Sequence, residues 1–142
     1  MTGLRAVVLM LASLLPQEAP RIDDMPRRVC ADAPRAIFQV ENRAAVPMLA
    51  ALRVERWSGE DDTPGWTVVQ ADVTQREGRP KQARNLTIEA RKRRDVPWEL
   101  KKRVGLPPLV TGRHRLVVTY SFGDGEASGT VAHEFVIADC GG

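Results

Sequence analysis

His114 and His133 are the two histidines of this 142-residue chain and its first candidates for acid–base or metal chemistry. Each falls in one of two consecutive strand-like runs, so they could lie on neighbouring strands of a hairpin. Two imidazoles make a poor metal site without a third ligand, and Glu134 should point to the opposite face of its strand from His133. The spacing matches no ligand motif, so we expect surface or edge histidines and no metal site.

Serine and calcium chemistry have no better support. Ser58, Ser121 and Ser128 fall in turns or at strand ends, and none lies in a Gly-x-Ser-x-Gly elbow. Asp124 and Glu126 faintly suggest a calcium loop, but that loop needs more oxygen ligands at defined spacing, and a hairpin turn explains them better. We therefore predict a protein that is not an enzyme and needs no cofactor.

The two cysteines, Cys30 and Cys140, lie just outside the ends of the strand-like region. In an exported protein they should pair with each other. The bridge would close a loop of about 110 residues, for which the chain-entropy model gives roughly 4 to 5 kcal/mol. Two independent buried thiols are the alternative.

A basic region extends from Arg76 to Arg103, where eleven Lys or Arg stand against four Asp or Glu. This region carries a net charge of +7, which leaves −4 for the rest of the chain. Such a field could attract an unknown acidic protein or an anionic envelope polymer. Nucleic acid is the weakest candidate partner, because Trp98 is the one aromatic residue among these charges. A solvated surface without a partner is the alternative. The candidate residues for an anionic ligand are Arg91, Lys92, Arg93, Arg94, Lys101, Lys102 and Arg103.

Strands must position all of these residues, because short apolar runs alternate with turn residues from residue 36 onward. A slip in phase near Val69 predicts a β-bulge, with Trp66 and Val68 pointing inward. The pair Pro107-Pro108 excludes a central strand there. The strand-like runs are residues 36–40, 49–57, 66–73, 85–90, 96–100, 114–122 and 129–137. About seven strands and no convincing helix after Pro20 predict an all-β, two-sheet antiparallel sandwich over residues 36–140.

The N-terminal residues indicate export. Arg5 and the apolar run from Ala6 to Leu15 are typical of a signal peptide, which we place at residues 1–20, and a linker should follow at residues 21–35. The run is about half of the ~20 residues that a membrane-spanning helix needs, so we expect no membrane span. The predicted location is therefore secreted or periplasmic. A buried N-terminal helix is the alternative.

The order of landmarks adds a family resemblance. The landmarks are Val40-Glu41-Asn42 at a strand end, Leu52 to Trp57, Trp66, Trp98, Leu109 to Val118 and Ala132 to Ile137. Over residues 36–139 this order resembles a family of bacterial immunoglobulin-like domains of exported proteins. His114 stands where the family usually has tyrosine, and the cysteine pair is not a requirement of the family.

The resemblance implies an immunoglobulin-like β-sandwich that is not catalytic. We therefore expect an exported module that presents a binding surface or acts as a spacer at the cell envelope. The alternative is an exported inhibitor of a protease or other enzyme that acts through a rigid loop, either residues 106–109 or residues 91–97.

Overall fold

Alternating buried and exposed side chains form β-strands throughout the part of the chain that the computed structural model describes, which comprises residues 18–23, 25–59, 65–74, 85–101, 103, 106–123 and 127–141. The strands are β1 (Arg21–Asp23), β2 (Arg28–Cys30), β3 (Arg35–Glu41), β4 (Met48–Ser58), β5 (Gly65–Gln70), β6 (Leu86–Ile88), β7 (Arg93–Glu99), β8 (Gly112–Phe122) and β9 (Ala127–Ala138). The described residues contain no helix. The predicted all-β class is confirmed.

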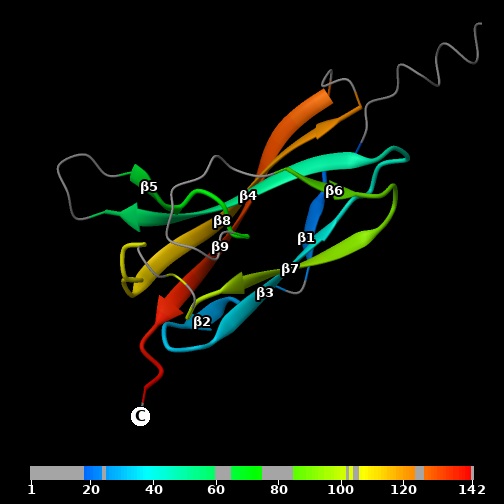
Figure 1. Cartoon of the computed structure of the whole chain (residues 1–142). Helices are drawn as coiled ribbons and strands as arrows, with labels where there is room; N and C mark the ends of the chain where they lie inside the picture. The colour runs from blue at the N-terminus through cyan, green and yellow to red at the C-terminus, as the bar shows by residue number, and fades with distance from the viewer. Residues whose placement is uncertain are drawn as a thin grey trace, which may run out of the picture.

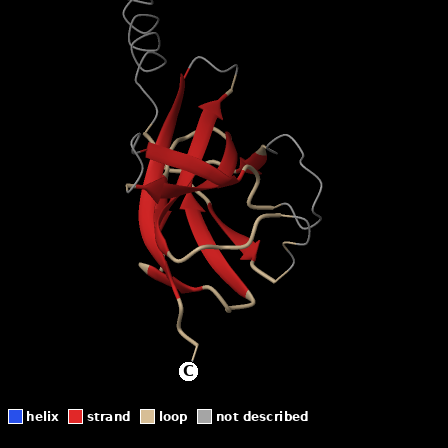
Figure 2. Cartoon of the chain, turned by 90° about the vertical axis from the view of Figure 1, so that its left-hand side faces the viewer, coloured by secondary structure: helices blue, strands red, loops and turns tan. Residues whose placement is uncertain are grey.

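Two sheets form the sandwich (Figures 1 and 2). The smaller sheet has the order β1-β3-β7, and the larger one has the order β2-β9-β8-β4-β5, with β6 paired to β4. Every pair is antiparallel except β2 with β9, which is parallel. Nine strands replace the predicted seven, because β1 and β2 lie within the segment 21–35 that we interpreted as a linker.

The core lies between the two sheets and contains an aromatic cluster. Phe38 of β3 stacks on Trp98 of β7 with ring centroids 5.8 Å apart, and Phe135 of β9 approaches both rings at 6.1 Å. All three side chains are at most 2% exposed. Burial of large aromatic rings from both sheets is a major stabilising contribution to a sandwich of this size.

The predicted bulge is confirmed, because the β4–β5 register shifts between Val54 and Glu55 and leaves Val69 without an opposite residue. The prediction that the side chains of Trp66 and Val68 point inward is wrong. Val68 is 48% exposed and lies opposite Glu55, while Trp66 lies opposite Trp57 on the outer face. The extra residue reverses the phase, so the inward position after the bulge belongs to Gln70.

Cys30 and Cys140 form the predicted disulfide. The bond joins the end of β2 to the residues after β9, which are the same two strands that pair in parallel. The ends of the sandwich are therefore held together both by the bond and by the β2–β9 ladder. Residues 1–17 of the predicted signal peptide, and Asp124 and Glu126 of the hairpin, lie outside the described residues. The described residues include no helix long and apolar enough to cross a membrane.

Candidate binding surface

His114 is a core residue, so its predicted place at a surface or edge is wrong. His114 is 0% exposed, and its ring stacks on that of Phe135 with ring centroids 5.9 Å apart. Strand alternation explains the position, since Leu116 on the same face of β8 is also buried. Its Nδ1 donates to the Gly112 carbonyl at 2.9 Å. Burial lowers the pKa of His114, the Gly112 carbonyl opposes this shift, and the charges of Arg56 and Arg103 add to it.

His133 lies on the same inner face of the sheet as His114 but is only half-buried, on a part of β9 that β2 does not cover. Burial lowers the pKa of His133, the charge of Arg27 lowers it further, and Glu134 raises it. Glu134 points to the outer face, as predicted, and forms an ion pair there with Arg113. Within the described ranges, no group of three or more His, Cys, Asp or Glu could hold a metal ion.

The candidate basic residues lie at the two ends of β7, whose first two residues are Arg93 and Arg94. At ~3.3 Å per residue, this strand spans roughly 20 Å, so the two groups do not form one patch. At its start, Arg91 has a positive φ of 58° in the turn, and Arg91, Lys92, Arg93 and Arg94 are exposed, as expected. Arg93 lies 3.8 Å from Glu41 and 3.9 Å from Asp23, so part of its charge is already compensated.

At the other end of β7, Lys101 is exposed and Lys102 lies outside the described residues. Arg103 is only 8% exposed. Its Nε donates to Gln70 Oε1 at 2.9 Å and its Nη1 donates to the Pro107 carbonyl at 2.7 Å. The same Gln70 oxygen accepts from Trp98 Nε1 at 2.8 Å. Burial lowers the pKa of Arg103. The Arg103 guanidinium therefore links the buried Gln70 to the loop at Pro107 and does not face solvent.

The structure shows a surface that the sequence did not predict, on the outer face of the larger sheet. Trp57 and Trp66 face each other across β4 and β5 with ring centroids 5.2 Å apart. Arg113 of β8 lies over both rings, at 5.2 and 5.3 Å, and Arg115 lies 4.2 Å from the Trp66 ring. These distances are in the range of cation–π contacts.

Glu55 binds Arg115 and a third arginine, Arg53, on the same face of the sheet. Its carboxylate accepts from Arg115 at 2.6 Å and from Arg53 at 3.0 Å. Burial alone would raise the pKa of Glu55, but the hydrogen bonds from Arg53 and Arg115 outweigh it and hold the pKa below its usual value. Glu55 is therefore a fixed negative charge that orients the guanidinium of Arg115 on the tryptophan ring.

Two exposed valines extend this surface, Val68 along β5 and Val136 across to β9. Val68 lies opposite Glu55 and is 48% exposed, and Val136 lies opposite Arg113 and is 45% exposed. We call these six residues the tryptophan–arginine face: Trp57, Trp66, Val68, Arg113, Arg115 and Val136. The face crosses four adjacent strands, β5, β4, β8 and β9. Tryptophan and arginine are the residue types that contribute most to binding energy at protein interfaces.

Comparison with known proteins supports the fold and gives no family. No protein-family model and no curated protein matches the chain. One chain of the CsuC–CsuE chaperone–tip adhesion subunit complex, from archaic chaperone–usher pili of Acinetobacter baumannii, matches with a TM-score of 0.57 at 13% identity. That match covers 87% of this chain and 58% of the other.

Two further matches have lower TM-scores. A β-glucosidase from Listeria innocua gives a TM-score of 0.44 at 11% identity and covers 86% of this chain and 16% of its own. The Pseudomonas fluorescens alkylpurine DNA glycosylase AlkC gives a TM-score of 0.41 at 15% identity. That match covers 94% of this chain and 34% of the glycosylase chain. At these scores neither match carries an argument about this chain. The first match shows that this sandwich has the architecture of a chain in a pilus assembly complex.

Proposed function

We propose that this chain is an exported, non-catalytic immunoglobulin-like module that binds a protein partner through its tryptophan–arginine face. The observation that carries the proposal is the placement of Trp57 and Trp66 on the outer face of the larger sheet, on which Val68 and Val136 are also exposed. An antiparallel sheet usually presents polar side chains to water on its outer face. Large apolar groups gathered there favour association with a second surface.

The face is preorganised for such a contact. Arg113 lies over both tryptophan rings, and Glu55 holds Arg115 against Trp66. Side chains that are already ordered lose less conformational entropy when a partner arrives. The charges are mixed, since Glu55 and Glu134 each lie within ion-pair distance of an arginine. A partner with an apolar centre therefore suits this face better than a polyanion does.

Export is the second part of the proposal, and the disulfide between Cys30 and Cys140 supports it. Such bonds form and persist in oxidising compartments such as the periplasm or the extracellular space. The sequence pattern at residues 1–20 is consistent with this location. Resemblance to bacterial immunoglobulin-like domains of exported proteins points the same way.

Affinity capture from an envelope extract tests the proposal. The bait is the full mature chain, and the two variants are Trp66→Ser and the triple substitution of Arg91, Arg93 and Arg94 by Ser. We expect the wild type and the triple variant to retain the same protein, and Trp66→Ser to lose it. Loss with the triple variant and retention with Trp66→Ser would instead assign binding to the basic residues. Retention of no protein by the wild type would favour a spacer.

One observation favours a second function, inhibition of a protease or other enzyme. The loop residues Leu106–Leu109 line a cavity of about 330 Å³, and Arg103 binds the Pro107 carbonyl from inside the domain. A loop held in one conformation is what an inhibitor needs, because binding then costs little ordering. Adding the purified chain to secreted proteases of each catalytic class tests this function. Inhibition should weaken with Arg103→Met, which keeps the stem but releases the carbonyl.

A further inference from the structure

The outer edge of β9 is only partly covered. On one side, β9 pairs with β8 from Ala127 to Ile137. On the other side, β2 pairs with β9 over Val136, Ile137 and Ala138 alone. Among the described residues, no strand pairs with the part of β9 before Val136 on this side. Unpaired strand edges are templates for another strand unless they are blocked.

The direction of the free backbone groups follows from the covered part of the edge. The amide of Val136 donates to the Arg27 carbonyl, and the Ala138 carbonyl accepts from the amide of Ala31, both at 2.9 Å. Backbone groups of every second residue point to the same side of a strand. Thr130, Ala132 and Glu134 therefore direct their N–H and C=O groups toward the free edge, two residues apart.

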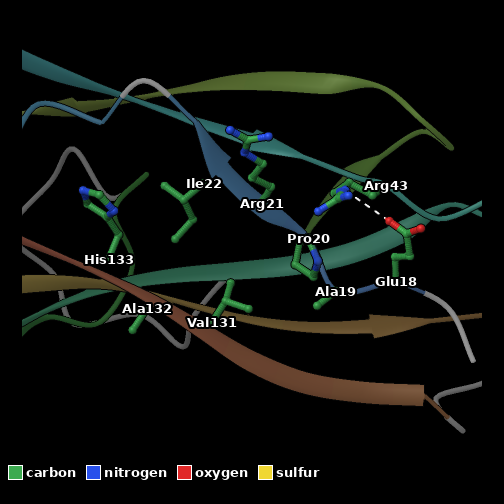
Figure 3. Close-up of a pocket in the computed structure, with 9 residues that line it drawn as sticks. All are labelled: Glu18, Ala19, Pro20, Arg21, Ile22, Arg43, Val131, Ala132 and His133. Carbon is green, nitrogen blue, oxygen red and sulfur yellow. Dashed lines mark ion pairs between the residues drawn. The ribbon is translucent and has the colours of Figure 1, made fainter.

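A cavity of about 600 Å³ lies beside this edge (Figure 3). Val131, Ala132 and His133 of β9 line one side of it, and the chain from Glu18 to Ile22 lines the other. Arg43 completes the lining and binds Glu18 at 3.1 Å. The space exists because β1 pairs with β3 in the smaller sheet, and the chain crosses to the larger sheet only at β2.

We propose that the β9 edge from Thr130 to Glu134 binds an extended peptide segment of a partner protein, which adds a strand to the larger sheet. This site uses backbone groups at the edge of the sheet and adjoins the tryptophan–arginine face only at Glu134, whose side chain pairs with Arg113. Only an extended chain presents alternating donors and acceptors at the repeat of about 6.8 Å, two residues of antiparallel strand, that this edge requires. Because side chains of a strand alternate between faces, every second peptide residue points toward the cavity.

The cavity wall selects the kind of side chain that enters. Ile22, Val131 and Ala132 are the apolar residues of the wall that remain when residues 1–20 are removed on export. At the rim, Arg21 has an acidic partner in Asp23 at 2.6 Å, whereas Glu18, the partner of Arg43, belongs to the predicted signal peptide. The peptide therefore has an apolar residue at the inward position. A second copy of this chain fits less well, because its own residues 21 and 22 would have to enter beside these.

A displayed library of random heptapeptides, selected on the immobilised full chain, supplies the probe. The selected peptides are then synthesised with a fluorescent label, and their binding is measured by anisotropy. Ala132→Pro removes the amide N–H that points outward at the centre of the edge. It leaves intact the backbone hydrogen bonds that Val131 and His133 form with β8. Ile22→Trp fills the cavity from β1, at a residue that remains when residues 1–20 are removed on export. We expect each substitution to weaken binding at least tenfold, and Trp66→Ser, on the outer face, to leave it unchanged.

Amide hydrogen exchange of the wild type gives a readout that does not depend on any variant folding. Bound peptide should slow exchange at Thr130, Ala132 and Glu134 at least tenfold and change His133 little, because the His133 amide already faces β8. Peptide binding that Trp66→Ser abolishes, or that leaves these three amides unprotected, would overturn the proposal. Light scattering that shows a dimer with the same amides protected in the absence of peptide would also overturn it, because the edge would then belong to a second copy.

Discussion

At the scale of single residues, Asn42 shows how one side chain joins two turns. It is 0% exposed, its Oδ1 accepts from the Ala44 amide at 2.9 Å, and its Nδ2 donates to the carbonyls of Val46 at 2.8 Å and Ile88 at 3.0 Å. Asn42→Ala leaves these buried groups unpaired, so we expect it to lower the free energy of unfolding by about 3 kcal/mol. Urea unfolding measures this loss. The exposed Asn85→Ala is the control, and an equal effect of both substitutions would contradict the assigned role.

His114 belongs to the same scale and gives a pH dependence. Its pKa in the folded protein is lowered, chiefly by burial, so the unfolded chain binds more protons once the pH falls below the ordinary value near 6.5. Stability should therefore be fully present above pH 7 and decline as the pH falls through 6.5 toward the folded pKa. One group contributes at most about 1.4 kcal/mol per pH unit.

The substitution His114→Phe isolates this contribution. Phenylalanine can keep the stack on Phe135 and has no proton to bind. We expect its free energy of unfolding to change less between pH 7 and pH 5 than that of the wild type. The remaining slope should contain the contribution of His133, whose pKa is also lowered. Identical slopes for the variant and the wild type would contradict the assignment to His114.

At the scale of strands, alternation predicted those elements that are long enough to show it. The runs that became β4, β8 and β9 were located to within a few residues, and the bulge at Val69 followed from a slip in phase. β1 and β2 have three residues each, which is too short for a period to be recognised. Their positions depend on β3 and β9, which lie far away in the sequence.

The binding surface was missed for a related reason. Trp66 was expected to point inward from the alternation along its strand, but Arg113 and Arg115 stabilise it on the outer face. Both arginines lie in another strand, almost fifty residues later. Arg103 was counted as a surface charge, although Gln70 and the Pro107 carbonyl bind it inside the domain. Contacts between segments that are distant in the sequence determine the positions of Trp66 and Arg103, and the local sequence pattern does not predict such contacts.

The disulfide gives a prediction at this scale. Cys30 and Cys140 are separated by 110 residues in the chain, so the bond restricts a long loop in the unfolded state. Cys140→Ser should lower the free energy of unfolding by about 2 to 5 kcal/mol. A reducing agent should destabilise the wild type by a similar amount and leave Cys140→Ser unaffected. Equal sensitivity of both proteins to the reductant would show that the bond is not the source of the effect.

At the scale of the whole molecule, the distribution of charge decides how binding should respond to salt. The chain has a net charge of +3, but its described basic candidates are split between the two ends of β7, and Arg103 is buried. These candidate residues therefore do not form one positive patch. The tryptophan–arginine face instead combines apolar side chains with arginines whose charges are paired, Arg113 with Glu134 and Arg115 with Glu55.

Retention of the captured partner should consequently depend little on ionic strength. Raising the salt concentration from 0.1 M to 1 M shortens the Debye length from about 10 Å to about 3 Å, which screens exposed charges but not buried apolar contacts. We expect the affinity measured by surface plasmon resonance to fall by less than about threefold over this range, because screening removes only exposed charge interactions. The triple substitution of Arg91, Arg93 and Arg94 by Ser should leave this response unchanged. A steep loss with salt that the triple substitution removes would mean that separate basic clusters bind the partner, and that the tryptophans serve only to stabilise the sheet.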